Sequence, residues 1–94
     1  MTKAFDMELF MTGVLTGSQA TRQRHLLQAK VIHAALAERW GQETPWGWKR
    51  KHLDWFIRDH LKQYNSGTRY YYLLTDRLIC RRLETSWTFA FIKI

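Results

Sequence analysis

The stretch LDWFIRDHLKQYNSGTRYYYLLTDRLICRRLE, residues 53–84, decides the fold of this chain. Apolar side chains recur in its first part, 53–64, at spacings of three and four, which predicts a helix with one buried face. A polar break at 65–67 interrupts this pattern, and Ser66 or Thr68 can cap a second helix that continues to the end of the stretch. Because the break is short, the two helices are expected to be antiparallel neighbours.

A long helix is expected upstream of this pair. Ser18 or Thr21 can cap it, it ends at Trp40, and Gly41 just beyond supplies a C-terminal signal. We expect it to be a central packing element whose buried face carries Leu27, Val31, Ala34 and Ala35, widened by Ile32 and Leu36.

The remaining segments are shorter. A short helix is expected within residues 5–15, with Asp6 as its N-cap. Thr44 and Pro45 are expected to be the N-cap and first residue of the helix that ends near residue 64. Aromatic side chains alternate with smaller ones over 86–94, a pattern typical of a strand. That strand could lie across a helical groove, pair with a short N-terminal strand, or pair with the same tail of a second subunit.

Length and composition are those of a single domain. The chain has 94 residues, of which 46% are hydrophobic, enough for a packed core. We therefore expect an all-α fold, a small bundle of three to four helices with a short extended C-terminal segment. The domain would span 1–94, with 1–17 as a short N-terminal helix or arm and 85–94 as the extended tail.

The charge of the chain indicates an anionic partner. Lys and Arg number 15 against 8 Asp and Glu, a net charge of +7, and 5 Trp, 4 Tyr and 5 Phe are interleaved with them. Cations neutralise phosphates, and aromatic rings offer faces on which bases stack. We expect nucleic acid to contact Lys49, Arg50, Lys51, Arg69, Arg77 and Arg81, with Trp46 or Trp48 stacking at the edge.

Residues 49–51 are the densest part of this set. They are expected at the first turn of a helix, where a phosphate would meet both the cations and free backbone N–H groups. The alternative is that Trp48 is a core residue and the basic triplet is a solvated surface. At the start of the last helix, Tyr71 and Tyr72 are expected to pack internally.

No motif for catalysis or metal binding stands out, so we expect neither an enzyme nor a cofactor. Four histidines, His25, His33, His52 and His60, fall in pairs separated by eight residues, which is not the spacing of a zinc site. Four acidic residues, Asp54, Asp59, Asp76 and Glu84, have basic residues three to five positions away, so solvated ion pairs explain them.

The lone Cys80 cannot form an intramolecular disulfide, and we expect it to be a small buried hydrophobic residue. No run of 18 apolar residues exists, so no membrane span is expected. Together these features predict a cytoplasmic protein.

The helix, break and helix over about 48–84 resemble the N-terminal SAM-like core-binding domain of phage-type tyrosine recombinases. The resemblance rests on the apolar run 53–61, the break, and Thr68 followed four residues later by Tyr72. It implies a helical domain that clamps DNA, with Thr68 near the DNA backbone and Tyr72 in the core. The 94 residues leave no room for the recombinase catalytic domain, so recombination is not expected.

Two functions follow from these patterns. The first is a small basic nucleic-acid-binding protein, with DNA favoured over RNA, acting as an accessory protein of a mobile element, phage or plasmid. The second is a protein-interaction module, such as a phage-type inhibitor or adaptor, in which exposed aromatic and Arg residues are the hot spots. A homodimer through the 86–94 tail is compatible with both.

Overall fold

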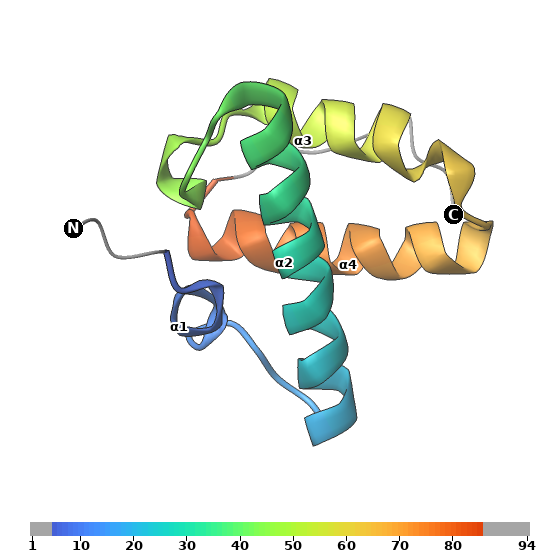
Figure 1. Cartoon of the computed structure of the whole chain (residues 1–94). Helices are drawn as coiled ribbons and strands as arrows, with labels where there is room; N and C mark the ends of the chain where they lie inside the picture. The colour runs from blue at the N-terminus through green and yellow to red at the C-terminus, as the bar shows by residue number, and fades with distance from the viewer. Residues whose placement is uncertain (1–4, 86–94) are drawn as a thin grey trace.

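The structure, a computed structural model, describes residues 5–85, and these form helices without a strand among them (Figure 1). This confirms the small all-α bundle. The expected C-terminal strand and the homodimer contact through it fall outside the described residues. The elements in chain order are α1 (Met7–Met11), α2 (Gln19–Trp40), the 3-10 turn η1 (Pro45–Gly47), α3 (Arg50–Trp55), the π turn η2 (Phe56–His60), the 3-10 turn η3 (Leu61–Gln63) and α4 (Ser66–Arg82).

The predicted ends of the first two helices are confirmed. Asp6 caps α1 by accepting a hydrogen bond from the Leu9 N–H at 3.1 Å. Ser18 caps α2, since its hydroxyl oxygen accepts from the Thr21 N–H at 3.2 Å. At the other end, Gly41 has a φ of +70°, the left-handed conformation that commonly ends a helix.

Two predicted caps are wrong. Pro45 begins the separate turn η1 (45–47) and does not start the helix predicted to end near residue 64. The helix α3 begins only at Arg50. The residue before α3, Lys49, donates its N–H to His52 Nδ1 at 2.8 Å, and this hydrogen bond holds the chain at the start of the helix. In α4 the cap is Asn65, whose Oδ1 accepts from the Thr68 N–H at 2.8 Å, and neither Ser66 nor Thr68 takes that place.

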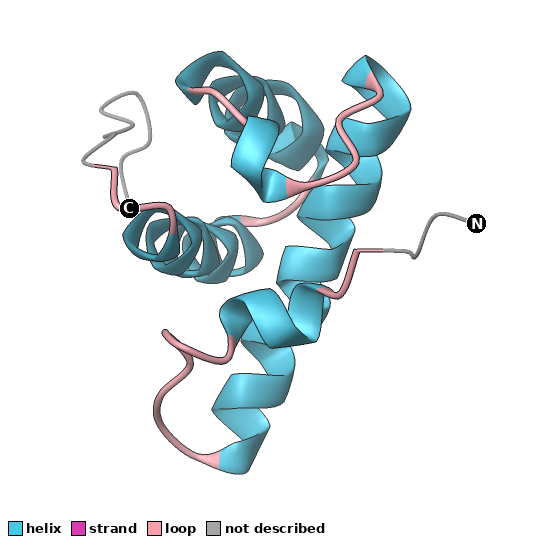
Figure 2. Ribbon diagram, turned by 90° about the vertical axis from the view of Figure 1, so that its left-hand side faces the viewer, coloured by secondary structure: helices cyan, strands magenta, loops and turns pink. Residues whose placement is uncertain are grey.

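The helical pair predicted from residues 53–84 is present. The consecutive elements α3, η2 and η3 run in one direction, and α4 returns beside them (Figure 1). The long helix α2 lies across this pair, and α1 packs beside α2 and α4 (Figures 1 and 2). The antiparallel pairing places the end of α4 on the same side of the molecule as the start of α3.

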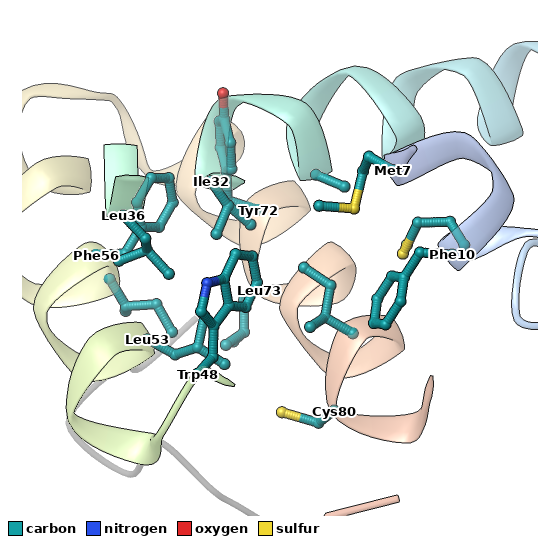
Figure 3. Close-up of a cluster of buried hydrophobic side chains, with 14 of the residues drawn as sticks. Met7, Phe10, Ile32, Leu36, Trp48, Leu53, Phe56, Tyr72, Leu73 and Cys80 are labelled. Carbon is teal, nitrogen blue, oxygen red and sulfur yellow. The ribbon is translucent and has the colours of Figure 1, made fainter. Parts of the chain in front are cut away.

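The core forms where all four α-helices meet (Figure 3). Met7 and Phe10 enter it from α1, Leu53 from α3, and Leu73 from α4. Several of its largest side chains are fully buried: Phe56, Met11, Ile32, Leu36, Leu53, Ile57, Leu61 and Ile79. Removal of this apolar surface from water is the main stabilisation of the fold.

The buried face of α2 differs from the prediction. Leu27 is 61% exposed, Val31 is 37% exposed, and Ala34 is also at the surface. Ile32 and Leu36 are buried as predicted, and Ala35 packs against the core. The rest of the buried face carries Leu26 and Ala29, together with the polar His25 and Gln28.

A buried polar contact explains why that face is turned inward. The Thr75 hydroxyl of α4 donates to Gln28 Oε1 at 2.7 Å, and His25 Nδ1 lies 2.7 Å from the hydroxyl oxygen of Thr75. Buried polar groups need such partners, so the crossing of α2 and α4 is fixed by these three side chains.

Candidate nucleic-acid interface

Three consecutive cations, Lys49, Arg50 and Lys51, are exposed on the turn that starts α3. The structure therefore brings them to one place, as predicted. The turn is anchored from inside by His52, which is buried and accepts the Lys49 N–H. Burial, and then the charges of Lys51 and Lys49, lowers the pKa of His52, which keeps its Nδ1 free to accept that bond.

The two tryptophans before this turn have different environments. Trp46 is 58% exposed, whereas Trp48 is only 4% exposed and belongs to the core (Figure 3). Trp48 is therefore no stacking surface for a base, and that part of the prediction is wrong. Its indole fills space between the helices instead, which holds the basic turn against the core.

Trp46 is held in place by the last turn of α4. The Arg82 guanidinium lies 4.9 Å from the Trp46 ring centroid and 5.1 Å from that of Phe10. Arg82 Nε also donates to the Phe10 carbonyl at 2.8 Å. The loop before α3, the end of α4 and α1 therefore adjoin one another.

The predicted cations of α4 do not form one cluster. Arg77 and Arg81 are exposed and, four residues apart, share one face of the helix. Arg69 lies twelve residues before Arg81, about 18 Å along the helix axis, at the opposite end of α4. Arg77 and Arg81 belong to the second half of α4, which ends on the side of the molecule where α3 starts (Figure 1). By this placement we call Lys49, Arg50, Lys51, Arg77 and Arg81 the basic end of the molecule, and Arg69 is outside it.

An aromatic cluster that sequence reasoning missed lies next to the basic end. The Trp40 and Trp55 rings meet edge to face at 5.3 Å, and Trp40 also lies 4.7 Å from the His52 ring. The Arg39 guanidinium covers both indoles, 5.1 Å from Trp40 and 5.3 Å from Trp55. Lys51 lies one turn before Trp55 in α3, so the cluster adjoins the basic turn.

A hollow of about 400 Å³ opens beside this cluster. Five residues line it: Ala35, Glu38, Arg39, Trp55 and His60. We call it the Trp hollow. Its residues come from two segments about 20 positions apart, the end of α2 and the region from α3 to η2, which is why no local motif revealed it.

The predicted solvation of Asp76 is wrong. Its side chain is 1% exposed, and neither carboxyl oxygen has a hydrogen-bond partner. Burial, with a further contribution from the Asp54 charge, raises the pKa of Asp76 well above its ordinary value. Asp54 itself pairs with Arg50 at 3.7 Å, so for Asp54 the predicted ion pair is present.

The remaining predicted positions are resolved as follows. Tyr72 is buried as expected, but Tyr71 is 41% exposed and lies under the Arg24 guanidinium, 4.4 Å from its ring centroid. Cys80 is a buried thiol, as expected, and burial raises its pKa to about 12.

Within residues 5–85, no group of three or more His, Cys, Asp or Glu side chains could hold a metal ion. None of the described helices is both long enough and apolar enough to cross a membrane.

Comparison with protein-family models, with curated proteins and with solved structures gave no match.

Proposed function

We propose that this protein binds nucleic acid through its basic end. The observation that carries the proposal is the exposed turn Lys49, Arg50 and Lys51, which is anchored by the hydrogen bond from the Lys49 N–H to His52. In the chain it is flanked by the exposed Trp46 and by Trp55 of the aromatic cluster. Adjacent cations on an ordered turn suit a phosphate backbone, and neighbouring rings suit bases.

The net charge of +7 supports the same proposal, because it would attract any polyanion over a distance. The resemblance of residues 48–84 to recombinase core-binding domains is the reason to favour DNA over RNA. In this proposal the protein is a DNA-binding accessory protein of a mobile element, phage or plasmid, active in the cytoplasm, without catalytic residues of its own.

Fluorescence anisotropy with labelled duplex DNA, single-stranded DNA and RNA tests this directly. Affinity should fall steeply between about 50 and 200 mM salt, since bound cations release counterions from phosphates. The variant Lys49→Glu/Lys51→Glu should lose about tenfold or more in affinity.

The matched control is Lys30→Glu/Lys62→Glu, which makes the same change in net charge at two exposed positions away from the basic turn. Equal losses in the two variants would mean that overall charge, and not the basic end, determines binding. Absence of binding to all three nucleic acids at low salt would refute the proposal.

A second candidate function, a protein-interaction module, is favoured by the exposed face of α2. Leu27 and Val31 are at the surface. Arg24 lies one turn before Leu27, and its guanidinium covers the ring of the exposed Tyr71, so these side chains form one surface. Binding there would depend little on salt and would be lost in Leu27→Glu, whereas nucleic-acid affinity would be unchanged in that variant.

A further inference from the structure

The Trp hollow has an unusual composition for a protein with a net charge of +7. It places an acidic side chain, Glu38, in one lining with the Trp55 indole and the Arg39 guanidinium. A carboxylate at this position repels phosphate, so the hollow is not simply an extension of the basic end.

The Glu38 carboxylate is available to a ligand. Glu38 is exposed, and among residues 5–85 it has no ion-pair partner, although Arg39 follows it in the chain. The Arg39 guanidinium lies over the Trp40 and Trp55 rings instead. The hollow therefore offers hydrogen-bond acceptors without a donor already bound to them.

The walls of the hollow are held in fixed positions. Trp55 is braced edge to face by Trp40. His60 stacks on the buried Phe56, with the two ring centroids 4.8 Å apart and the rings 15° from parallel. A volume of about 400 Å³ is within the range of about 300 to 1,000 Å³ typical of small-ligand sites.

The hollow also lies within reach of a phosphate on the basic turn. Lys51 precedes Trp55 by four residues, about 6 Å along the axis of α3. A nucleotide whose phosphate is held at Lys51 can therefore direct its base toward Trp55, provided that the base is unpaired.

The chemistry of the hollow selects among the bases. A carboxylate accepts two parallel hydrogen bonds from adjacent N–H donors. Guanine presents that pair as its N1–H and its exocyclic amino group. Adenine and cytosine place a ring acceptor beside the amino group, and thymine and uracil have a single N–H between two carbonyls.

We propose that the Trp hollow binds an unpaired guanine, stacked on the Trp55 indole, with its N1–H and amino group donating to the Glu38 carboxylate. This inference rests on the proposed function and makes the ligand a single-stranded nucleic acid, since a paired guanine has no free Watson–Crick edge. DNA and RNA present the same edge, so the two are separated by experiment.

The test uses single strands of about twelve nucleotides, thymine throughout except for one central guanine, adenine or cytosine. A parallel set of RNA strands has uracil in place of thymine. Anisotropy at low salt should show that the guanine strand binds about tenfold more tightly than the others. The set that shows the larger preference for guanine tells whether the natural ligand is single-stranded DNA or RNA.

The decisive variant is Glu38→Gln, with Glu43→Gln as a control that removes an equally exposed carboxylate elsewhere. If Glu38 accepts from guanine, its loss should weaken the guanine strand about tenfold and remove the preference. If Glu38 acted only through its charge, Glu38→Gln should bind every strand more tightly, because a negative charge that repels phosphate is removed.

The outcomes separate the inference from the function on which it rests. Equal or tighter binding of the guanine strand by Glu38→Gln, or no preference among bases in the unmodified protein, would overturn the guanine site and leave the basic end standing. No binding of any strand at about 50 mM salt would refute the proposed function and the guanine site together.

Discussion

At the scale of single residues, Asp76 has the least expected environment. Both of its carboxyl oxygens are buried without hydrogen-bond partners, and Asp54 adds repulsion. These surroundings raise the pKa of Asp76, so its contribution to stability is complete below the ordinary carboxyl pKa of 3.8. That contribution is lost as the pH rises through the folded value.

Replacing Asp76 with Asn should therefore stabilise the protein at neutral pH and remove the Asp76 contribution to its pH dependence. Relative to Asp76→Asn, the free energy of unfolding of the unmodified protein should fall by up to about 1.4 kcal/mol per pH unit above the ordinary carboxyl range. Urea denaturation at a series of pH values measures both quantities.

Asp59→Asn serves as the comparison, because Asp59 is exposed and its replacement should change little. If Asp76→Asn is less stable than the unmodified protein at neutral pH, then the buried carboxylate has a stabilising partner and this account of Asp76 is wrong.

The charge spacing along the chain could not predict this environment. Asp76 has Arg77, Arg81 and Arg82 close by in sequence, but Arg77 and Arg81 point to solvent while Asp76 faces the core. Proximity in sequence gives distance along a helix, whereas the packing of the neighbouring helices decides which side is buried.

At the scale of elements, α2 shows the same ambiguity. Its apolar residues come in adjacent pairs, Leu26 with Leu27 and Val31 with Ile32. Spacings of three and four are therefore satisfied on two overlapping faces. The prediction was right for Ile32 and Leu36 and wrong for Leu27 and Val31. The contacts of His25 and Gln28 with Thr75 turn Leu26 inward, and no pattern within α2 could reveal a partner 47 to 50 residues away.

Truncating the two faces of α2 should have very different effects. Leu36→Ala removes a fully buried side chain and should lower the free energy of unfolding by about 2–5 kcal/mol. Leu27→Ala, on the exposed face, should change it by less than about 0.5 kcal/mol. Comparable losses in urea denaturation would mean that Leu27 is buried in solution.

The helix ends, by contrast, were largely predictable, because a cap depends on a few neighbouring residues. Gly41 was identified from its position alone, and its positive φ gives the reason. Asn65 was missed, although it lies at the predicted break, because Ser66 and Thr68 are equally good capping residue types.

Two glycine substitutions should change stability in opposite directions. Gly41→Ala forces a side chain into the left-handed conformation and should be destabilising by about 1 kcal/mol, although no atom lies within 4 Å of the new Cβ. Gly67→Ala, inside the first turn of α4, should be stabilising by about 0.5–1 kcal/mol. Thermal unfolding of the two variants provides the measurement, and a shift of the same sign in both would contradict the assignment.

At the scale of the whole molecule, two buried histidines limit stability in acid. Burial is the main cause that lowers the pKa of both His25 and His52. Their contribution to stability is therefore complete above the ordinary histidine pKa of 6.5, and it is lost as the pH falls below that value toward the folded ones.

Asp76 acts in the opposite direction over the same pH interval, so the histidines are tested in the Asp76→Asn background. There the midpoint of urea denaturation should fall as the pH is lowered from about 6.5 to about 5. Adding His52→Asn, which retains a side-chain acceptor, should reduce this loss, and His33→Asn is the comparison, since His33 is only partly buried. An unchanged midpoint over this interval in Asp76→Asn would contradict the assigned roles.

The candidate site was predictable only where it is contiguous in sequence. Lys49, Arg50 and Lys51 were found because charge density is visible in a linear chain. The Trp hollow was not, since Glu38 and Trp55 become neighbours only when α2 crosses the segment that begins with α3. The fold class needed only helical periodicity, whereas the site needed the three-dimensional crossing.

The π turn η2 bears on how this chain could change over evolution. There the Leu61 N–H donates to the Phe56 carbonyl, five residues back, so the turn contains one residue more than an α-helix on the same path. A descendant that lost one residue from this turn could form a regular α-helix and still direct Phe56 and Leu61 into the core. The same loss within α4 would rotate all later side chains by about 100°. Single-residue deletions in the lineage of this protein should therefore collect in η2 and be purged from α4.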